Sequence, residues 1–275
     1  MLEVNLPYCW QHAIPVFRRI SGGGVVFHDE GNLNLSFITQ YTLKNFNQYR
    51  SFLEPVLNYL KSIGISLTID QRNNLRLGSK KVSGNAQFIS RNRMLSHGTL
   101  LINSDLKRLK QTLKKSKPLM MQVESRATSS VRSSVTNIAV QIETPLEVEQ
   151  IAKDLKEVFG GQNFAAYQFT EAEWQKIVQL ANPKYHSFQW TVAESPPLKI
   201  EKRIKLASDV IHLRYELQEG IFKKVEIFDR EFEFLKEMFE GQKLSEELWR
   251  KIETILADLS VERRLKMEQF INYFF

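Results

Sequence analysis

Three consecutive glycines, Gly22–Gly24, stand directly before the apolar run Val25–Phe27. Glycine has no Cβ, so a loop of this kind can bring its backbone N–H groups close around a phosphate or an acyl phosphate ester. Arg18 and Arg19 precede it and add fixed positive charge. The same letters are also typical of an ordinary glycine-rich turn with solvated arginines. Because the loop leads into a strand that we expect at residues 23–28, we predict a rigid cradle, whose spacing matches neither the P-loop nor the Rossmann pattern.

Apolar periodicity predicts the elements around this loop. The first strand is joined through a turn at 29–32 to a second strand at 33–39, where apolar positions alternate. One helical face then runs over 46–63, with Pro55 as a kink or near the true start of the helix. We also expect strands at 65–70, 75–78, 85–90 and 97–102, a turn at 91–96, and helices opened by capping boxes at 144–147 and 170–173, the first ending at 160–161.

A domain boundary is expected near residues 187–197, where Pro196 and Pro197 interrupt any regular element. Beyond it, the pattern predicts strands at 201–218 and 221–228, hinged at 219–220, and helices near 231–240, 244–258 and 261–273. The fold class is therefore α+β, with a mixed or antiparallel sheet and packed helices. A large domain over residues 1–187 precedes a small α+β C-terminal domain over 188–275.

Length and composition limit the classes of protein. The 275 residues suit one large domain, or a larger and a smaller one. No stretch approaches ~20 apolar residues, so we expect no membrane span, and the first residues do not resemble a secretory signal. Cys9 is the single cysteine, which excludes an internal disulfide and fits a reducing compartment. We therefore expect a cytoplasmic protein.

The charge is unevenly distributed. Residues 1–190 contain 23 basic and 14 acidic residues, a balance of +9, whereas residues 191–275 contain 15 and 17, a balance of −2. A basic excess favours an anionic ligand or an acidic protein partner, although it also serves solubility. The basic run at 107–117 contains no aromatic residue for base stacking, so we expect no nucleic-acid partner. This basic run is typical of a solvated helix face or of a surface that binds an acidic protein.

Three further segments carry polar groups that suit chemistry. Lys81 follows Lys80 on a predicted strand and precedes Ser83 and Gly84, so its ammonium could neutralise a phosphate and polarise a carboxylate oxygen. Most such lysines are simply solvated.

His97 opens an apolar strand and could bind a ligand or cap a turn. The polar segment 130–137 could cover a site or connect two elements. The chain lacks Cys-x-x-Cys, His-Glu-x-x-His and Gly-x-Ser-x-Gly motifs.

Together, these segments resemble the lipoate–protein ligase A family, in order as well as in content. The resemblance lies in Arg-Arg-x-Ser-Gly-Gly-Gly-x-Val-Phe-His-Asp at 18–29, Lys-x-Ser-Gly at 81–84, His-Gly-Thr-Leu-Leu at 97–101 and Ser-Val-Arg-Ser-x-Val-Thr-Asn at 130–137. It extends over nearly the whole chain, because residues 188–230 also look like the family's small C-terminal domain. It implies a biotin/lipoate ligase-like fold, similar to class II synthetases.

The resemblance implies an AMP-forming ligase that activates lipoate with ATP and Mg²⁺ and passes the lipoyl group to a lysine. Lys81 would be the catalytic residue, contacting the lipoyl carbonyl and the phosphate, and Asp29 would lie near the metal. The residues implied to bind the nucleotide or the lipoyl-adenylate are Arg19, Ser21, Gly22, Gly23, Gly24, Val25, Val26, His28, Asn32, Ser83, Gly84 and His97. The implied partners are apo lipoyl domains of 2-oxoacid dehydrogenase E2 subunits and the glycine-cleavage H protein.

The chain departs from the family at two places. It begins almost at the point that follows a helix and several strands of the family's central sheet, so we expect either an upstream start or a shortened form with an open sheet edge. Phe88 stands where some members carry an arginine near the ligand.

Two other functions stay open on the sequence alone. An octanoyl- or lipoyl-transferase of the same fold would need a cysteine nucleophile near the lysine motif, whereas Cys9 precedes the glycine loop. A non-catalytic homologue that binds lipoate or the acceptor is the third possibility. A biotin–protein ligase is disfavoured, because its Gly-Arg-Gly-Arg-type loop is absent.

Overall fold

The computed structural model describes residues 3–113, 118–125, 133–161, 165–206 and 209–274. Two compact units are distinguished, and each combines segments that are distant in the sequence. One unit contains residues 19–110 and 129–168, and it is called the glycine-loop unit below. The other contains residues 1–18, 111–128 and 169–275, and it is called the terminal unit. The predicted division into 1–187 and 188–275 therefore stays a prediction.

The glycine-loop unit is built on an antiparallel sheet with the strand order β1-β6-β5. In this sheet, Leu35 of β1 lies opposite Gly98 of β6, and Asn85 of β5 lies opposite the same glycine. A second antiparallel sheet has the order β2-β3-β4. The elements are β1 (Asn32–Gln40), α2 (Tyr49–Ser62), β2 (Thr68–Ile69), β3 (Leu75–Leu77), β4 (Lys80–Ser83), β5 (Asn85–Ser90), β6 (Arg93–Leu101), a 3-10 turn (Ile138–Gln141) and α4 (Val148–Gly160), while α3 (Leu106–Thr112) lies at its border.

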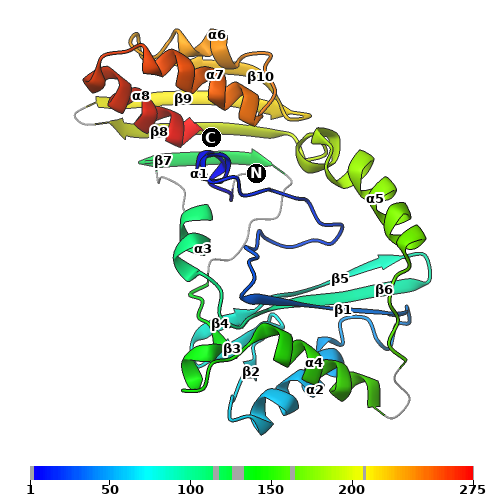
Figure 1. The fold of residues 1–275 in the computed structure, drawn as a ribbon. Helices are drawn as coiled ribbons and strands as arrows, with labels where there is room; N and C mark the ends of the chain where they lie inside the picture. Colours follow the sequence, from blue (N-terminus) through cyan, green and yellow to red (C-terminus); the bar gives the residue numbers. More distant parts are fainter. Residues whose placement is uncertain (1–2, 114–117, 126–132, 162–164, 207–208, 275) are drawn as a thin grey trace. The chain divides into compact units, whose positions relative to one another are not determined.

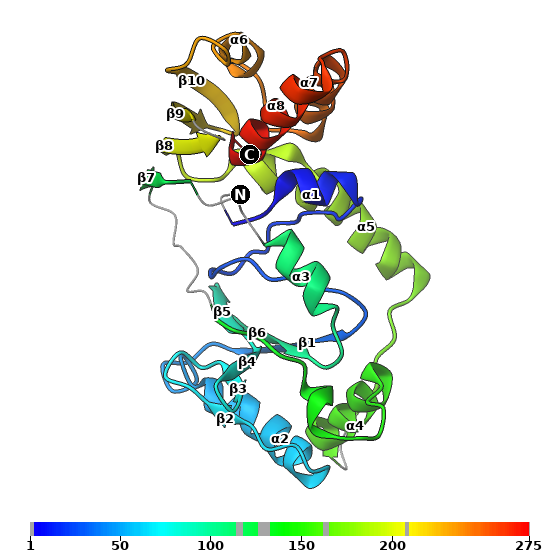
Figure 2. The ribbon, with the colours of Figure 1, turned by 90° about the vertical axis from the view of Figure 1, so that its left-hand side faces the viewer.

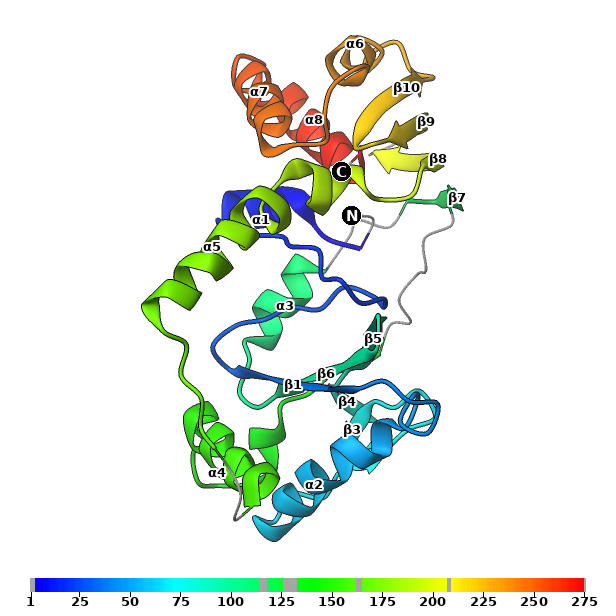
Figure 3. The same ribbon diagram turned by 90° about the vertical axis from the view of Figure 1, so that its right-hand side faces the viewer.

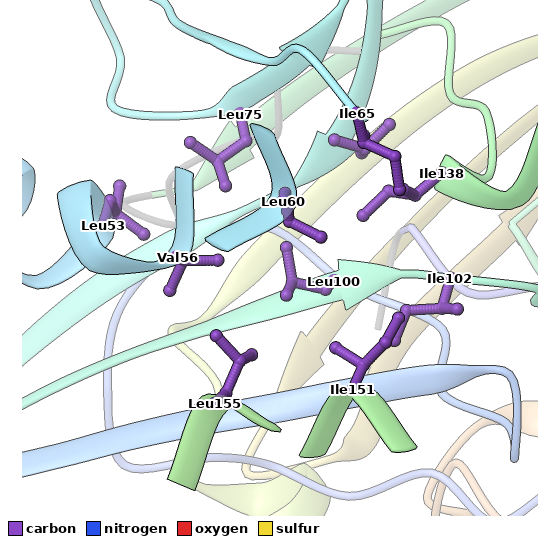
Figure 4. Close-up of a cluster of buried hydrophobic side chains, with 11 residues drawn as sticks. Leu53, Val56, Leu60, Ile65, Leu75, Leu100, Ile102, Ile138, Ile151 and Leu155 are labelled. Carbon is purple, nitrogen blue, oxygen red and sulfur yellow. The ribbon is translucent and has the colours of Figure 1, made fainter. Parts of the chain in front are cut away.

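Helices α2 and α4 cover one face of the β1-β6-β5 sheet (Figure 1). Apolar side chains from both helices and from β3, β4 and β6 form the core between these layers (Figure 4). Leu60 of α2 and Val82 of β4 are fully buried there, and Leu100 of β6 and Leu155 of α4 are 1% exposed. Burial of this apolar surface stabilises the unit at roughly 25 cal/mol per Å². The core therefore fixes the sheet that carries the motifs.

The terminal unit contains an antiparallel sheet with the order β10-β9-β8-β7. Helices α7 and α8 lie on one face of this sheet (Figures 2 and 3). Trp10 of α1 contacts Trp249 of α7, with ring centroids 5.8 Å apart, so the first residues belong to this unit. The elements are α1 (Leu6–Gln11), β7 (Met120–Ser125), α5 (Glu171–Tyr185), a π-helical turn (Gln189–Ala193), β8 (Leu198–Leu206), β9 (Asp209–Gln218), β10 (Ile221–Ile227), α6 (Leu235–Phe239), α7 (Glu246–Ala257) and α8 (Val261–Phe274).

Most predicted elements are confirmed within a few residues, and the α+β class is confirmed. The capping box at Thr170 forms in both directions, with Glu173 as its partner. Glu219 and Gly220 adopt positive φ angles of 53° and 69° and make the predicted hinge between β9 and β10. Pro55 lies inside α2. No helix among the described residues has the length and apolar character needed to cross a membrane.

The stretch predicted as strand at 201–218 is divided between two strands, β8 and β9, and three further local predictions are wrong. Residues 23–28 form no strand, because the loop carbonyls are held by a side chain instead of a neighbouring strand. The turn predicted at 91–96 is shorter, since β6 begins at Arg93. Helix α4 begins at Val148 after Glu147, whose side chain makes no capping bond. The Thr144 box does not form there, because Leu146 packs against the core and Glu147 stays extended, with ψ at 131°.

Candidate active site

The candidate site occupies the face of the β1-β6-β5 sheet opposite α2 and α4. Successive side chains of a strand point to opposite faces, and on β6 the buried positions are Met94, Ser96, Gly98 and Leu100. His97 and Thr99 therefore point to the other face, where the segment before β1 also lies (Figure 1). We call this the open face.

Three rows of side chains cross the open face in register. Asn34 of β1 pairs with Thr99 of β6 at one end. Ser36 of β1, His97 of β6 and Ala86 of β5 form the middle row, and the row of Ile38, Leu95 and Phe88 is apolar. Ile38 is 71% exposed, an unusual position for a large apolar side chain. The face thus changes from polar to apolar along the strands and suits an amphipathic ligand.

The glycine loop is braced by the side chain of Arg19. Its Nη2 atom donates hydrogen bonds to the carbonyl oxygens of Gly22 and Gly24, both at 2.8 Å, and its Nε atom donates to Gly22 at 3.2 Å. Gly23 has a φ of +106°, and a Cβ there would lie 2.7 Å from Nη2 of Arg19. Within the described part of the chain, the N–H groups of Gly22–Gly24 have no acceptor. They are therefore left for a ligand, as in an anion-binding nest.

Ser21 and His97 connect the loop to the open face. The Ser21 hydroxyl lies 2.6 Å from Nε2 of His97, and Ser21 is 8% exposed. Burial lowers the pKa of His97, and the charge of Arg19 and the neighbouring His28 lower it further. The uncharged form of the imidazole is therefore favoured. Val25 is half-buried and Val26 is 40% exposed, so these two residues continue the loop along the surface.

His28 and Asn32 form a second polar group at the start of β1. Nδ2 of Asn32 lies 3.0 Å from Nδ1 of His28 and donates to Oδ1 of Asn34 at 3.1 Å. Burial of its ring and the charge of Arg19 lower the pKa of His28, against the opposing charge of Asp29. Among the described atoms, Oδ1 of Asn32 is buried without a hydrogen-bond partner. A buried acceptor of this kind requires a donor from a ligand or a water.

Asp29 orders the backbone. Its carboxylate accepts hydrogen bonds from the N–H groups of Gly31 at 3.1 Å and of Asp105 at 2.7 Å. Nowhere in the described ranges do three or more His, Cys, Asp or Glu residues gather as a metal site would require. Both carboxylate oxygens of Asp29 thus accept from backbone N–H groups, and its metal role stays a prediction.

Lys81 is held at the edge of the same site by its backbone. Its N–H donates to Ser134 at 2.8 Å, and its carbonyl accepts from Thr136 at 3.1 Å. The ammonium rests against Gly84, where a Cβ would lie 3.0 Å from Nζ. Burial lowers the pKa of Lys81, opposed by the charge of Asp70. Gly84 in turn donates to the hydroxyl of Thr99 at 3.3 Å, which places the ammonium beside the polar end of the open face.

The structure also reveals residues that the sequence did not single out. Asn34, Ser36 and Thr99 belong to the site, and the alternation of polar side chains at 32, 34 and 36 was the signal for two of them. Ser83 is buried, and its hydroxyl accepts from Asn85 at 3.2 Å, so it supports the turn beside Lys81. A small pocket is lined by residues of β1, α2, β5 and β6, together with Ser83.

Two further expectations concern Arg18 and the polar segment 130–137. Arg18 does not add free charge beside the loop, because its guanidinium donates to the carbonyl of Trp190 at 2.8 Å and to the hydroxyl of Ser195 within the terminal unit. In the polar segment 130–137, residues 130–132 lie outside the described residues. The remainder pairs with Lys81 in a parallel bridge through Val135 and therefore belongs to the wall of the site.

Cys9 is unsuited to acyl transfer. It lies in α1 of the terminal unit and is 1% exposed. Burial raises the pKa of its thiol to about 11. The thiolate that a transferase requires is therefore scarce at neutral pH.

The comparisons with known sequences all point to one family. The sequence model of the lipoyl protein ligase A/B catalytic domain matches residues 1–160. Lipoate–protein ligase 1 of Staphylococcus aureus is 37% identical over 227 residues, which are 82% of this chain and 68% of that protein. Lipoate-protein ligase LplJ of Bacillus subtilis is 33% identical over 230 residues, 82% of this chain and 69% of that protein.

Solved structures share the fold. A lipoate-protein ligase A bound with ATP has a TM-score of 0.55 at 24% identity, over 69% of this chain and 76% of that chain. A bipartite lipoate protein ligase, studied with its E2 lipoyl domain from Thermoplasma acidophilum, has the same TM-score and identity over 69% of this chain and 74% of that chain.

Proposed function

This chain belongs to the lipoyl protein ligase A/B family, and from that premise we propose that it activates lipoate with ATP and attaches the lipoyl group to a lysine of an acceptor protein. It is an ATP-dependent ligase. In the first step, a lipoate carboxylate oxygen attacks the α-phosphorus of ATP, and the bond to pyrophosphate breaks. In the second step, the acceptor amine attacks the acyl carbon, and AMP leaves with the bridging oxygen.

The observation that carries this proposal is the gathering of three features on one open face. The N–H groups of Gly22–Gly24, which have no acceptor among the described residues, supply donors for the phosphate. The Lys81 ammonium supplies a charge that stabilises the negative oxygens as the acyl phosphate forms and breaks. The apolar row at Ile38 gives the acyl chain and its dithiolane a surface to cover. We assign the adenylate to the polar end of the face and the dithiolane to its apolar end.

The other predicted residues have supporting positions in this proposal. Arg19 shapes the loop through its carbonyl groups and leaves its charge close to the phosphate. Asn32 offers its buried Oδ1 to a donor of the nucleotide. Asp29 holds the turn between the loop and Asp105. We propose that Mg²⁺ arrives with the ATP phosphates, as is usual for an ion that keeps several waters and few protein ligands.

The acceptors that we propose are apo lipoyl domains of 2-oxoacid dehydrogenase E2 subunits and the glycine-cleavage H protein. The related bipartite ligase was studied with an E2 lipoyl domain, which supports the first class. The basic excess of residues 1–190 favours an acidic surface on the acceptor. We place the reaction in the cytoplasm, where ATP is available and a lone thiol stays reduced.

The test combines purified protein, ATP, lipoate and an apo lipoyl domain, and it follows the mass of the acceptor. We expect the mass to rise by one lipoyl group, with AMP and pyrophosphate formed in equal amounts. Bound lipoyl-adenylate without any acceptor modification would instead favour the non-catalytic homologue.

A second assay supplies an octanoylated carrier protein and omits ATP. We expect no transfer under this condition, because Cys9 is buried and protonated. Efficient ATP-independent transfer that disappears in Cys9→Ser would contradict the ligase assignment and favour the transferase.

A further inference from the structure

The second half-reaction has a chemical requirement that the donors of the glycine loop and the Lys81 ammonium do not meet. An acceptor lysine with the usual pKa of about 10.4 is almost entirely an ammonium near neutral pH. An ammonium has no lone pair with which to attack the acyl carbon. The amine must therefore lose a proton at the site, and a base within hydrogen-bond reach accelerates that step.

The Ser21–His97 pair stands where such a base is required. The Ser21 hydroxyl immediately precedes the glycine loop and lies 2.6 Å from Nε2 of His97. His97 and Thr99 share the open face two residues apart, which corresponds to about 7 Å along a strand. Thr99 contacts Gly84, against which the Lys81 ammonium rests. The pair therefore lies between the loop donors and the turn that holds Lys81.

We propose that Ser21 and His97 form a relay that removes the proton from the acceptor lysine during lipoyl transfer, an inference that rests on the proposed function. The lysine ammonium first gives one proton to Oγ of Ser21, while the hydroxyl proton passes to Nε2 of His97. The free amine then bonds to the acyl carbon and loses its second proton to water. The carbon–oxygen bond to the phosphate breaks, AMP leaves, and the imidazolium then returns its proton to solvent. This path requires the histidine tautomer with its proton on Nδ1.

The surroundings keep the histidine ready to accept a proton. The titratable or charged groups that face it are Arg19 and His28 of the loop segment. Across the sheet it is paired with Ser36 of β1 and Ala86 of β5, neither of which titrates. The cationic neighbour Arg19 also disfavours the ammonium form of an arriving lysine. Lys81 cannot replace the pair, because its role requires a positive charge.

The test measures how one bound adenylate divides between two nucleophiles. Preformed lipoyl-adenylate is added to the protein with an apo lipoyl domain and hydroxylamine, an amine that is largely uncharged at neutral pH. The ratio of lipoylated domain to lipoyl hydroxamate does not depend on how fast the adenylate was made. We expect His97→Gln and Ser21→Ala each to lower this ratio by about 100-fold, the lower range for general base catalysis.

A double variant distinguishes a relay from two separate contacts. Because both residues serve one proton path, His97→Gln combined with Ser21→Ala should lower the ratio no further than either single change. His12→Gln, an exposed histidine of the terminal unit, is the matched control and should leave the ratio unchanged. The deficit of the variants should also shrink about tenfold per pH unit, because the neutral fraction of the acceptor lysine grows by that factor.

An unchanged ratio in His97→Gln, with wild-type protein that transfers normally, would overturn the relay while leaving the ligase intact. A deficit that does not shrink with pH would also overturn it, because a purely structural wall would affect all pH values alike. Failure of the wild-type protein to lipoylate the domain at all would instead refute the proposed function, and the relay would fall with it.

Discussion

The two faces of the β1-β6-β5 sheet are formed by the same three strands, but one face packs into the core and the other carries the candidate site. Toward α2 and α4, Leu100 of β6 is 1% exposed in an apolar core, and Met94 of the same strand is fully buried. On the open face, His97 and Thr99 alternate with them and contact the loop and the turn beside Lys81. Under the proposed function, residues that serve stability and residues that serve chemistry are therefore one position apart along the same strand. Adjacent substitutions should therefore have consequences of different kinds.

The largest effect is expected for the polar end of the open face. Lys81→Ala removes the ammonium that rests against Gly84, and the rate of lipoyl transfer should fall about 10³-fold, or ~4 kcal/mol, the upper range for loss of one electrostatic donor. The melting temperature should change little. Lys80→Ala, on the exposed neighbouring residue of the same strand, is the control. Equal losses in both variants would mean that general surface charge, and not this ammonium, supports the reaction.

The buried face should respond in stability alone. Leu100→Ala removes a side chain that is 1% exposed in the core, and the free energy of unfolding should fall by about 3 kcal/mol, typical for a buried leucine. Denaturant titration measures this change, while KM for lipoate, taken well below the melting temperature, should match that of wild type. A raised KM in the folded variant would show that the two faces are coupled.

Within the glycine loop, a smaller effect is expected on both the stability and the rate of adenylation. Gly23→Ala places a Cβ against Arg19 at a φ of +106°, so stability should fall by about 1 kcal/mol and the adenylation rate by roughly tenfold through the displaced brace. Gly64 also has a positive φ, of +88°, but open space around it. Gly64→Ala should therefore show the stability loss without the loss of rate. The rate of pyrophosphate release compares the two variants.

The smallest change in stability is expected at the apolar end of the open face. Ile38 is 71% exposed, so Ile38→Ser should alter the free energy of unfolding by no more than about 0.5 kcal/mol. If the dithiolane covers this row, KM for lipoate should rise several-fold through lost apolar contact. The measurement compares KM for lipoate with KM for ATP, which should not change. An unaltered KM for lipoate would move the acyl chain to another part of the face.

The sequence predicts the buried side of the sheet and most of its strands, because alternation and helical periodicity follow directly from packing. It also identifies the motif residues that meet on the open face, through their resemblance to a family. The strand predicted at 23–28 is wrong for a physical reason. A short apolar run does not specify its partner, and the carbonyl groups of Gly22 and Gly24 pair with Arg19 instead.

Other features depend on tertiary contacts that a local pattern does not contain. The capping box at Thr170 forms because its helix is exposed and free to follow its own signal. The capping box at Thr144 does not form, because Leu146 packs against the core instead. The adjacent arginines Arg18 and Arg19 look equivalent in the sequence, yet one binds Trp190 in the terminal unit and the other braces the loop. Only the folded chain separates them.

The bond between Arg18 and Trp190 has a consequence for biosynthesis, because the two residues are 172 positions apart. At about 5–20 residues per second, a ribosome needs roughly 10–30 s to reach the second after making the first. During that interval, Leu6 and Cys9, which end up buried, have no completed core to enter. The glycine-loop unit can close once residue 168 has emerged, while the beginning of the chain still awaits its end. Until the rest of the terminal unit has been made, these side chains therefore remain without their native contacts.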